Sequence, residues 1–232
     1  MAGTPVVFLP GLLEDADAFA YQVERLREAA PCTVADLTRG ESIAELAKEA
    51  LKQAPAGKFA LAGHSMGGYV ALEILRQASA RVDRLALLNT HARPDSPEAT
   101  ANRKRLMALA ERDFPEVIRT LIPKLATEEH LPEISGAITE MALGCGKDAF
   151  LRQQRAIIGR IDSRPHLAAI ACPTLVIAAR HDALMPVDLL EELAHGIRGA
   201  RLAIVEDSGH MAPLEQPEEV FGLLREWLDM AR

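Results

Sequence analysis

The chain has 232 residues, of which 49% are apolar and 25% are charged, and its formal net charge is −7. This length allows one large domain or a core with an insertion, and the composition is that of an ordinary globular protein. The acidic balance argues against a nucleic-acid partner, because phosphate binding needs a concentrated Lys and Arg surface. The one basic cluster, at residues 102–105, lies in a helical pattern and is expected to be a solvated face.

Neither a leader peptide nor a membrane segment is expected. The apolar stretch near the N-terminus is too short for a signal peptide and has no basic residues before it. No apolar run approaches the roughly 20 residues that a membrane helix needs. Cys32, Cys145 and Cys172 are far apart and suggest neither a disulfide framework nor a metal site. We therefore expect a cytoplasmic protein with reduced thiols in its core.

Strand and helix patterns alternate over the first 90 residues. Short apolar runs predict strands, and apolar residues at spacings of three and four predict helices. Strands are expected within 4–11, 32–37, 58–63 and 82–90, and helices at 17–30, 42–54 and 67–78. Ser42 is expected to cap the second helix, with Glu45 completing a capping box. Such near-continuous apolar strands with helical crossovers predict a parallel sheet that is covered on both faces.

The alternation stops near residue 92. Helical patterns follow at 99–113, 114–125, 133–144 and 148–160, with no strand pattern among them. The alternation then resumes, with strands within 172–182 and 200–207 and helices at 187–197 and 217–231. We therefore predict an α/β protein with a mostly parallel, doubly wound sheet. Residues 1–91 and 169–232 are expected to form the core, and residues 92–168 a helical insertion.

The stretch GHSMGG, residues 63–68, lies between an expected strand and an expected helix. Gly63, Ser65 and Gly67 fit the pattern G-x-S-x-G, in which a serine occupies a tight strand-to-helix turn. Glycine is needed on both sides, because a side chain there would strike the neighbouring strand or helix. Such a turn projects the hydroxyl above the carboxyl edge of the sheet, beside free N–H groups of the helix. The alternative is a plain structural turn.

A serine nucleophile needs a base and a carboxylate that orients the base. His210 is favoured among the seven histidines, because it follows the last expected strand, at the edge where Ser65 lies. Asp182 is the favoured acid, since it follows an earlier strand and lies between Ser65 and His210 in chain order. The weaker alternatives are Asp162, Asp188 and Asp207.

Attack of the serine on a carbonyl group would create an oxyanion, which needs hydrogen-bond donors. One donor is expected to be the N–H of Met66, directly after the nucleophile. The other should come from the loop after the first strand, where Gly11 allows a close backbone approach. The N–H of Leu12 is favoured there, and that of Leu13 is the alternative. This chemistry needs neither a metal nor an organic cofactor.

The helical insertion is expected to form much of the substrate pocket. The candidate pocket residues are Leu13, Phe114, Leu121, Met141 and Phe150. For any single residue of the insertion, packing within the core is the alternative role. An apolar pocket of this kind suits a small-to-medium acyl or alcohol group.

Together these motifs resemble the α/β-hydrolase superfamily over essentially the whole chain. The matching stretches are LPG at 9–11, GHSMGG at 63–68, ARHDALMP at 179–186 and SGHMAPLEQP at 208–217. The chain is most similar to small bacterial carboxylesterases and to 3-oxoadipate enol-lactonase-like hydrolases. The resemblance implies an α/β-hydrolase fold with its helical cap at 92–168. Some relatives carry the acid after the strand at 82–90, where this chain has Asn89, and that favours Asp182.

We therefore expect a serine hydrolase of the carboxylesterase type. It would act on a small ester or lactone, as a monomer or homodimer, without a nucleic-acid or membrane partner. One alternative is an enol-lactone hydrolase, a C–C bond hydrolase or a perhydrolase with the same triad. C–C bond hydrolases of this superfamily often carry Trp after the catalytic His, whereas Met211 stands there, which favours ester or lactone substrates. The other alternative is a slow-turnover sensor of small molecules.

Overall fold

The computed structural model describes residues 3–230 and contains one sheet of six parallel strands. The strand order is β2-β1-β3-β4-β5-β6. The strands are β1 (Val6–Leu9), β2 (Cys32–Val34), β3 (Phe59–His64), β4 (Val82–Leu88), β5 (Thr174–Ala179) and β6 (Arg201–Val205). This sheet confirms the predicted α/β class, and every neighbouring pair is parallel.

The central strands are buried along their whole length. Every residue of β1, β3, β4 and β5 is buried, whereas β2 and most of β6, at the two edges, are partly exposed. This explains the near-continuous apolar runs in the sequence, because a parallel sheet is covered by helices on both faces. The carboxyl ends of all six strands therefore meet at one edge of the sheet, where loops can bring distant residues together.

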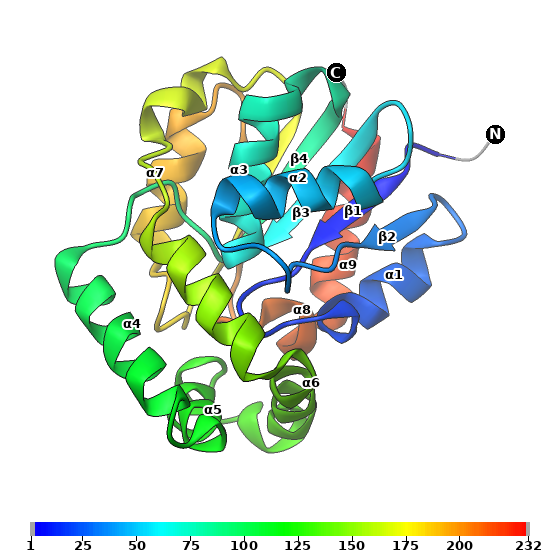
Figure 1. Cartoon of the computed structure of the whole chain (residues 1–232). Helices are drawn as coiled ribbons and strands as arrows, with labels where there is room; N and C mark the ends of the chain where they lie inside the picture. The colour runs from blue at the N-terminus through cyan, green and yellow to red at the C-terminus, as the bar shows by residue number, and fades with distance from the viewer. Residues whose placement is uncertain (1–2, 231–232) are drawn as a thin grey trace.

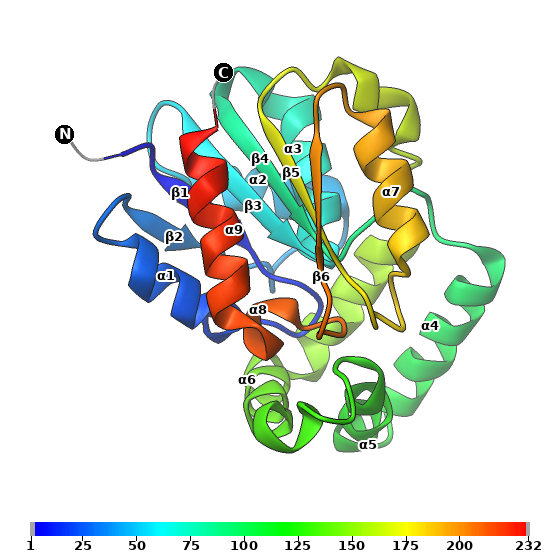
Figure 2. The ribbon, with the colours of Figure 1, turned by 180° about the vertical axis from the view of Figure 1, so that it is seen from behind.

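Helices cover both faces of the sheet (Figures 1 and 2). The first face carries α2 (Ile43–Gln53), α3 (Met66–Ala78) and α7 (Val187–Gly196), whose apolar residues share one core cluster. The other face carries α1 (Ala20–Leu26) and α9 (Pro217–Asp229), which pack in a second cluster around Trp227. Short helices connect these elements: η1 (Ala16–Phe19), η2 (Ser79–Arg81), η4 (Arg164–Ala169) and α8 (Ala212–Glu215). The helix expected at 217–231 ends at Asp229, and residue 231 lies outside the described part of the chain.

The capping box predicted for the second helix is present in modified form. Ser42 Oγ accepts a hydrogen bond from Glu45 N at 3.2 Å, which caps α2. The Glu45 carboxylate reaches back one residue further than expected and accepts from Glu41 N at 2.9 Å. The first of these bonds satisfies a free N–H group in the first turn of the helix, and the second holds the residue that precedes the cap.

Residues 92–168 contain no strand, as expected. They form α4 (Pro97–Ala110), α5 (Phe114–Leu121), η3 (Ile122–Lys124) and α6 (Leu131–Ile158), followed by η4. The two helices expected at 133–144 and 148–160 are joined in α6 across a kink at Gly146, whose φ is 82°. In Figure 1, α4, α5 and α6 lie together below the sheet. Among residues 3–230, no helix combines the length and the apolar character needed to cross a membrane.

Candidate active site

Ser65 occupies a sharp turn between β3 and α3. Its backbone has φ 51° and ψ −115°, a conformation that few side-chain-bearing residues adopt. A Cβ added at Gly63 would lie 2.5 Å from Gly67 O, and one added at Gly67 would lie 2.0 Å from Leu9 O. Neither position can hold a larger residue without moving the backbone. The steric role predicted for the two glycines is therefore visible in the structure.

His210 follows β6 and faces Ser65 across the carboxyl edge of the sheet. Its Nε2 lies 2.9 Å from Ser65 Oγ. Its Nδ1 lies 2.8 Å from Asp182 Oδ2, in the loop after β5. All three side chains are largely buried, with residue exposures of 8%, 2% and 5% for Ser65, His210 and Asp182. The structure thus brings together three residues that are far apart in the sequence, in an arrangement able to pass a proton from the hydroxyl to the imidazole.

The Asp182 carboxylate is held ionised by its surroundings. Its Oδ1 accepts hydrogen bonds from the N–H groups of Leu184 and Met185, at 2.8 and 2.9 Å. Burial acts to raise the pKa of Asp182, but the attraction of His210 and the hydrogen bonds from His210, Asn89 and Met185 lower it overall. An ionised carboxylate at this position fixes Nδ1 of the imidazole as the protonated nitrogen.

Two residues beside Ser65 have backbone N–H groups without a hydrogen-bond partner among the described residues. They are Leu12 and Met66, which both line the cavity next to the serine. The alternative donor, Leu13 N, is already used, because it donates to Gln153 Oε1 at 3.1 Å. The geometry therefore favours Leu12 over Leu13.

A cavity of about 260 Å³ opens beside Ser65, between the sheet edge and helices α4, α5 and α6. Of the predicted pocket residues, Leu13, Leu121 and Met141 line it. Phe114 and Phe150 do not line the cavity, and their prediction needs correction. Their rings pack against each other, with centroids 5.9 Å apart, in an apolar cluster of the helical insertion that also includes Leu13. Large aromatic side chains here stabilise the helical insertion rather than contact the cavity.

One wall of this cavity is polar, which the sequence did not suggest. Asn102, Arg103 and Gln154 belong to it. The expectation that residues 102–105 form a solvated face is wrong for Arg103, whose side chain is only 20% exposed. Arg103 lies 3.1 Å from Asp95 Oδ1 and donates to Gln154 Oε1 at 3.0 Å. Gln154 Nε2 is buried and has no partner among the described residues.

Glu14 and His64 also lie at the site, and sequence reasoning assigned neither a role. His64 is fully buried, and its ring centroid lies 5.0 Å from that of His210. Its Nδ1 lies 2.9 Å from Glu14 Oε1. The only sequence signal was the position of His64 beside the serine. Its partner lies 50 residues away in the sequence, so the pair became visible only in the fold.

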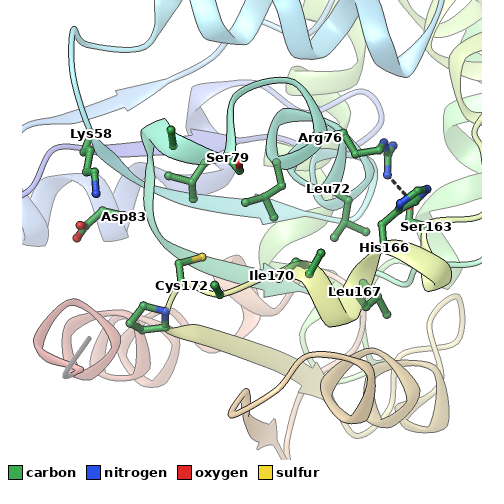
Figure 3. A pocket seen from close by; sticks show the side chains of 16 residues that line it. Lys58, Leu72, Arg76, Ser79, Asp83, Ser163, His166, Leu167, Ile170 and Cys172 are labelled. Atoms are coloured by element: carbon green, nitrogen blue, oxygen red, sulfur yellow. Dashed lines mark hydrogen bonds between the residues drawn. The ribbon is translucent and has the colours of Figure 1, made fainter.

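A second cavity, of about 490 Å³, lies at the opposite edge of the sheet, near the amino ends of β4 and β5 (Figure 3). Leu72 and Arg76 of α3 face His166 and Leu167 of η4 across it, and Arg76 donates to Ser163 Oγ at 3.0 Å. It contains none of the residues predicted to act. Within residues 3–230, no three His, Cys, Asp or Glu side chains are grouped to hold a metal ion. The cavity beside Ser65 is therefore the candidate active site.

The chain belongs to the Alpha/beta hydrolase family, whose model matches residues 6–223. A thermophilic esterase from Thermogutta terrifontis, solved with malate bound, is 31% identical, with a TM-score of 0.90 over 98% of this chain and 90% of that one. The enol-lactonase from Burkholderia xenovorans LB400 is 24% identical, with a TM-score of 0.89 over 99% and 93%, which shows a shared fold. A relative from Variovorax paradoxus (strain S110), whose name reads "Putative carbamate hydrolase RutD", is 29% identical over 76% of this chain and 69% of its own length.

Proposed function

We propose that this chain is a serine hydrolase that cleaves carboxylic esters with small-to-medium acyl or alcohol groups. The observation that carries the proposal is the continuous contact from Ser65 Oγ to His210 and on to Asp182, at 2.9 and 2.8 Å. Ser65 and His210 line a mostly apolar cavity. Its volume of about 260 Å³ is below the roughly 300–1,000 Å³ of a typical ligand pocket. The esterase relative at 31% identity is consistent with this substrate class.

The reaction follows from the positions of these groups. Ser65 Oγ attacks the ester carbonyl carbon as its proton passes to His210 Nε2, and the carbonyl electron pair becomes an oxyanion. The N–H groups of Leu12 and Met66 bind that oxyanion. When the intermediate collapses, the ester C–O bond breaks, and His210 returns its proton to the leaving alcohol. His210 then takes a proton from water as the water oxygen attacks the acyl carbon. The bond from that carbon to Ser65 Oγ breaks, His210 returns the proton to Oγ, and the acid leaves.

The direct test compares the unmodified chain with Ser65→Ala on p-nitrophenyl esters of graded acyl length. We expect Ser65→Ala to fold normally and to lose roughly 10⁴-fold or more in kcat, because the nucleophile is absent. A fluorophosphonate should label Ser65 stoichiometrically in the unmodified chain. Normal turnover in Ser65→Ala would disprove the proposal.

Other reactions could use the same groups, and a wider panel separates them. Relatives named as carbamate hydrolases make a carbamate the second candidate, since its carbonyl carbon undergoes the same attack. The panel should therefore include lactones, enol-lactones, carbamates, vinylogous diketones and a peracid assay. Turnover far below about 1 per second on every compound, against typical enzyme rates, would instead favour a small-molecule sensor. The cytoplasmic location and the monomeric or homodimeric state stay predictions.

A further inference from the structure

Glu14 and His64 form a buried pair behind the proposed general base. Glu14 lies in the loop after β1, two residues beyond Leu12, and His64 is the last residue of β3. Their side chains are 6% and 0% exposed. The two carboxylate oxygens lie 2.9 and 3.0 Å from His64 Nδ1. The mechanism proposed above uses neither side chain, although burying charged groups is costly unless they are paired.

The pair makes one further hydrogen bond at each of its ends. At one end, Gly11 N donates to Glu14 Oε2 at 2.7 Å. At the other end, His64 Nε2 lies 2.8 Å from the backbone carbonyl oxygen of His210. Gly11 directly precedes Leu12, whose N–H is the proposed oxyanion donor. A continuous chain of hydrogen bonds therefore joins the oxyanion loop to the residue that acts as the base.

Both ring nitrogens of His64 face oxygen atoms. A carbonyl oxygen only accepts, so Nε2 carries a proton and donates it to His210 O. Burial is the largest influence on His64 and acts to lower its pKa. The charge and hydrogen bond of Glu14, the His210 carbonyl and the charge of Asp182 together outweigh burial and raise the pKa of His64. The raised pKa favours the protonated ring, in which both nitrogens donate, Nδ1 to the Glu14 carboxylate and Nε2 to His210 O.

Gly11 gives independent evidence that the carboxylate is fitted to the oxyanion loop. A Cβ added at Gly11 would lie 2.3 Å from Glu14 Oε1. A side chain at residue 11 would therefore force the buried Glu14 carboxylate to move. From the sequence, this glycine was expected only to allow a close backbone approach in the oxyanion loop. In the structure, the group that comes close is Glu14.

We propose that Glu14 and His64 are positioning residues that hold the Leu12 N–H and the His210 imidazole at the separation required by the tetrahedral transition state. The inference rests on the proposed ester hydrolysis. Both loops must act on the same carbonyl group, and a displacement of about 1 Å can lower the rate by about 100-fold. Neither side chain exchanges a proton or forms a bond with the substrate in this role.

Three conservative variants of the full chain test the hydrogen bonds of Glu14 and His64 one at a time. His64→Asn keeps an amide near the position of Nδ1 but loses the hydrogen bond to His210. His64→Gln keeps an amide near the position of Nε2 but loses the hydrogen bond to Glu14. Glu14→Gln removes the charge and turns an amide donor toward His64 or Gly11. Glu206→Gln is the matched control, because Glu206 forms an exposed ion pair at the surface.

The readouts are kcat and KM for a short p-nitrophenyl ester and the affinity for a trifluoromethyl ketone that adds to serine. The alcohol and acid products serve as ground-state ligands. We expect kcat/KM and ketone affinity to fall together, by about 10- to 100-fold, because both depend on oxyanion geometry. KM and product affinity should stay close to those of the unmodified chain, and Glu206→Gln should change none of these quantities.

A merely structural role gives a different pattern. It would lower Tm and the fraction of active molecules, which fluorophosphonate titration counts, while the remaining folded molecules keep their ketone affinity. That pattern, or unchanged kcat/KM in the variants that fold, would overturn the inference. The two His64 variants keep the test available if Glu14→Gln does not fold. If the unmodified chain neither cleaves any ester nor reacts with the fluorophosphonate, the proposed function fails, and the positioning role fails with it.

Discussion

Asn89 donates a hydrogen bond to Asp182, with 2.9 Å between Asn89 Nδ2 and Asp182 Oδ2. The same carboxylate oxygen lies 2.8 Å from His210 Nδ1. Asn89 is fully buried and has φ 47°, a left-handed conformation that asparagine adopts more readily than most residues. In the sequence, Asn89 indicated only that a carboxylate is missing after β4. In the structure, it helps to hold the carboxylate that follows β5.

We expect Asn89→Gly to lower both stability and turnover. Glycine removes the amide without straining the backbone, and losing a hydrogen bond to a charged group costs about 1.5–3 kcal/mol. The pKa of Asp182 is lowered in the folded state, so its stabilising contribution is present above the unfolded-state value of about 4 and is lost as pH falls through the folded value. Urea unfolding at pH 7 and pH 3.5 measures the free energy of unfolding of Asn89→Gly and of the unmodified chain. We expect these two free energies to differ less at pH 3.5 than at pH 7. A difference that does not depend on pH would contradict this role.

Asp182→Asn should be far more damaging to turnover than to folding. The amide of the new side chain can present its N–H to the imidazole of His210 and stabilise the wrong tautomer. In a Ser-His-Asp triad, this substitution lowers kcat by about 10⁴-fold. Asp207→Asn is the control, since Asp207 is the rival acid in the same region and its side chain is exposed. Steady-state kinetics on a p-nitrophenyl ester measures both variants. Comparable losses in the two would remove Asp182 from its proposed role.

The fold and the three central residues were accessible from the sequence because each leaves a local signal. Apolar runs that end in a loop mark strands, and the carboxyl ends of parallel strands meet at one edge. Ser65 directly follows such a run, and Asp182 and His210 lie in the loops just after two others. Chain order and strand position together therefore specify an arrangement that the structure reproduces. Their catalytic roles stay a prediction until turnover is measured.

The contacts that surround these three residues could not be predicted from the sequence, because they depend on the direction in which each side chain points in the fold. Glu14 and His64 are 50 residues apart, and nothing in the spacing indicates that they meet. Phe114 and Phe150 were equally uncertain, because an apolar residue on a helix can face either a cavity or a neighbouring helix. Arg103 lies among three other polar residues at 102–105, yet the orientation of α4 places it beside the cavity. Tertiary packing decides where these side chains lie, and the local sequence pattern does not.

Gly67→Ala tests the steric explanation of the turn. The added Cβ would lie 2.0 Å from Leu9 O, so either β1 or the start of α3 must move. We expect a variant that is strongly destabilised or that loses activity completely. Gly136→Ala, in α6, is the control, because nothing lies within 4 Å of its added Cβ, and alanine favours a helix over glycine by about 1 kcal/mol. Thermal unfolding with an ester assay measures both, and a stable, active Gly67→Ala variant would refute the explanation.

Asp95, near the start of the helical insertion, contacts Arg103 of α4 and Arg160, which lies just beyond the end of α6. Its carboxylate lies 2.7 Å from Arg160 and 3.1 Å from Arg103, and its side chain is 1% exposed. Burial acts to raise the pKa of Asp95, but the hydrogen bond from Arg160 and the charge of Arg103 lower it overall. Asp95→Asn leaves two buried cations unbalanced and should cost about 3–5 kcal/mol at pH 7.

The sign of the pH dependence follows from the lowered pKa of Asp95. The stabilising contribution of the ionised Asp95 carboxylate is fully present above the pKa of the unfolded state, about 4, and is lost as the pH falls through the lower pKa of the folded state. The free energies of unfolding of Asp95→Asn and of the unmodified chain should therefore converge in acid. Urea unfolding at several pH values measures this. Asp162→Asn, which breaks an exposed ion pair with Arg164, should have little effect at any pH. If both substitutions lowered the free energy of unfolding equally, the ion pairs of Asp95 would contribute no more to stability than an exposed ion pair does.

Arg103 should influence which ester is preferred. It lines the cavity and donates to Gln154 Oε1, while Gln154 Nε2 has no partner among the described residues. Arg103 gives this wall a positive charge, so we expect esters with a carbonyl or carboxylate at their far end to react faster than alkyl esters of equal size. A hydrogen bond to a charged group is worth about 1.5–3 kcal/mol, or about 10- to 100-fold in kcat/KM.

Arg103→Met should reduce this preference while leaving turnover of the alkyl ester nearly unchanged. Asp95 keeps its contact with Arg160 at 2.7 Å, so the fold should survive the substitution. Lys104→Met removes a neighbouring exposed cation and is the control for a general change in charge. The measurement is the ratio of kcat/KM for the two matched esters in each variant. If the ratio is the same in Arg103→Met as in Lys104→Met, the polar wall does not select the substrate.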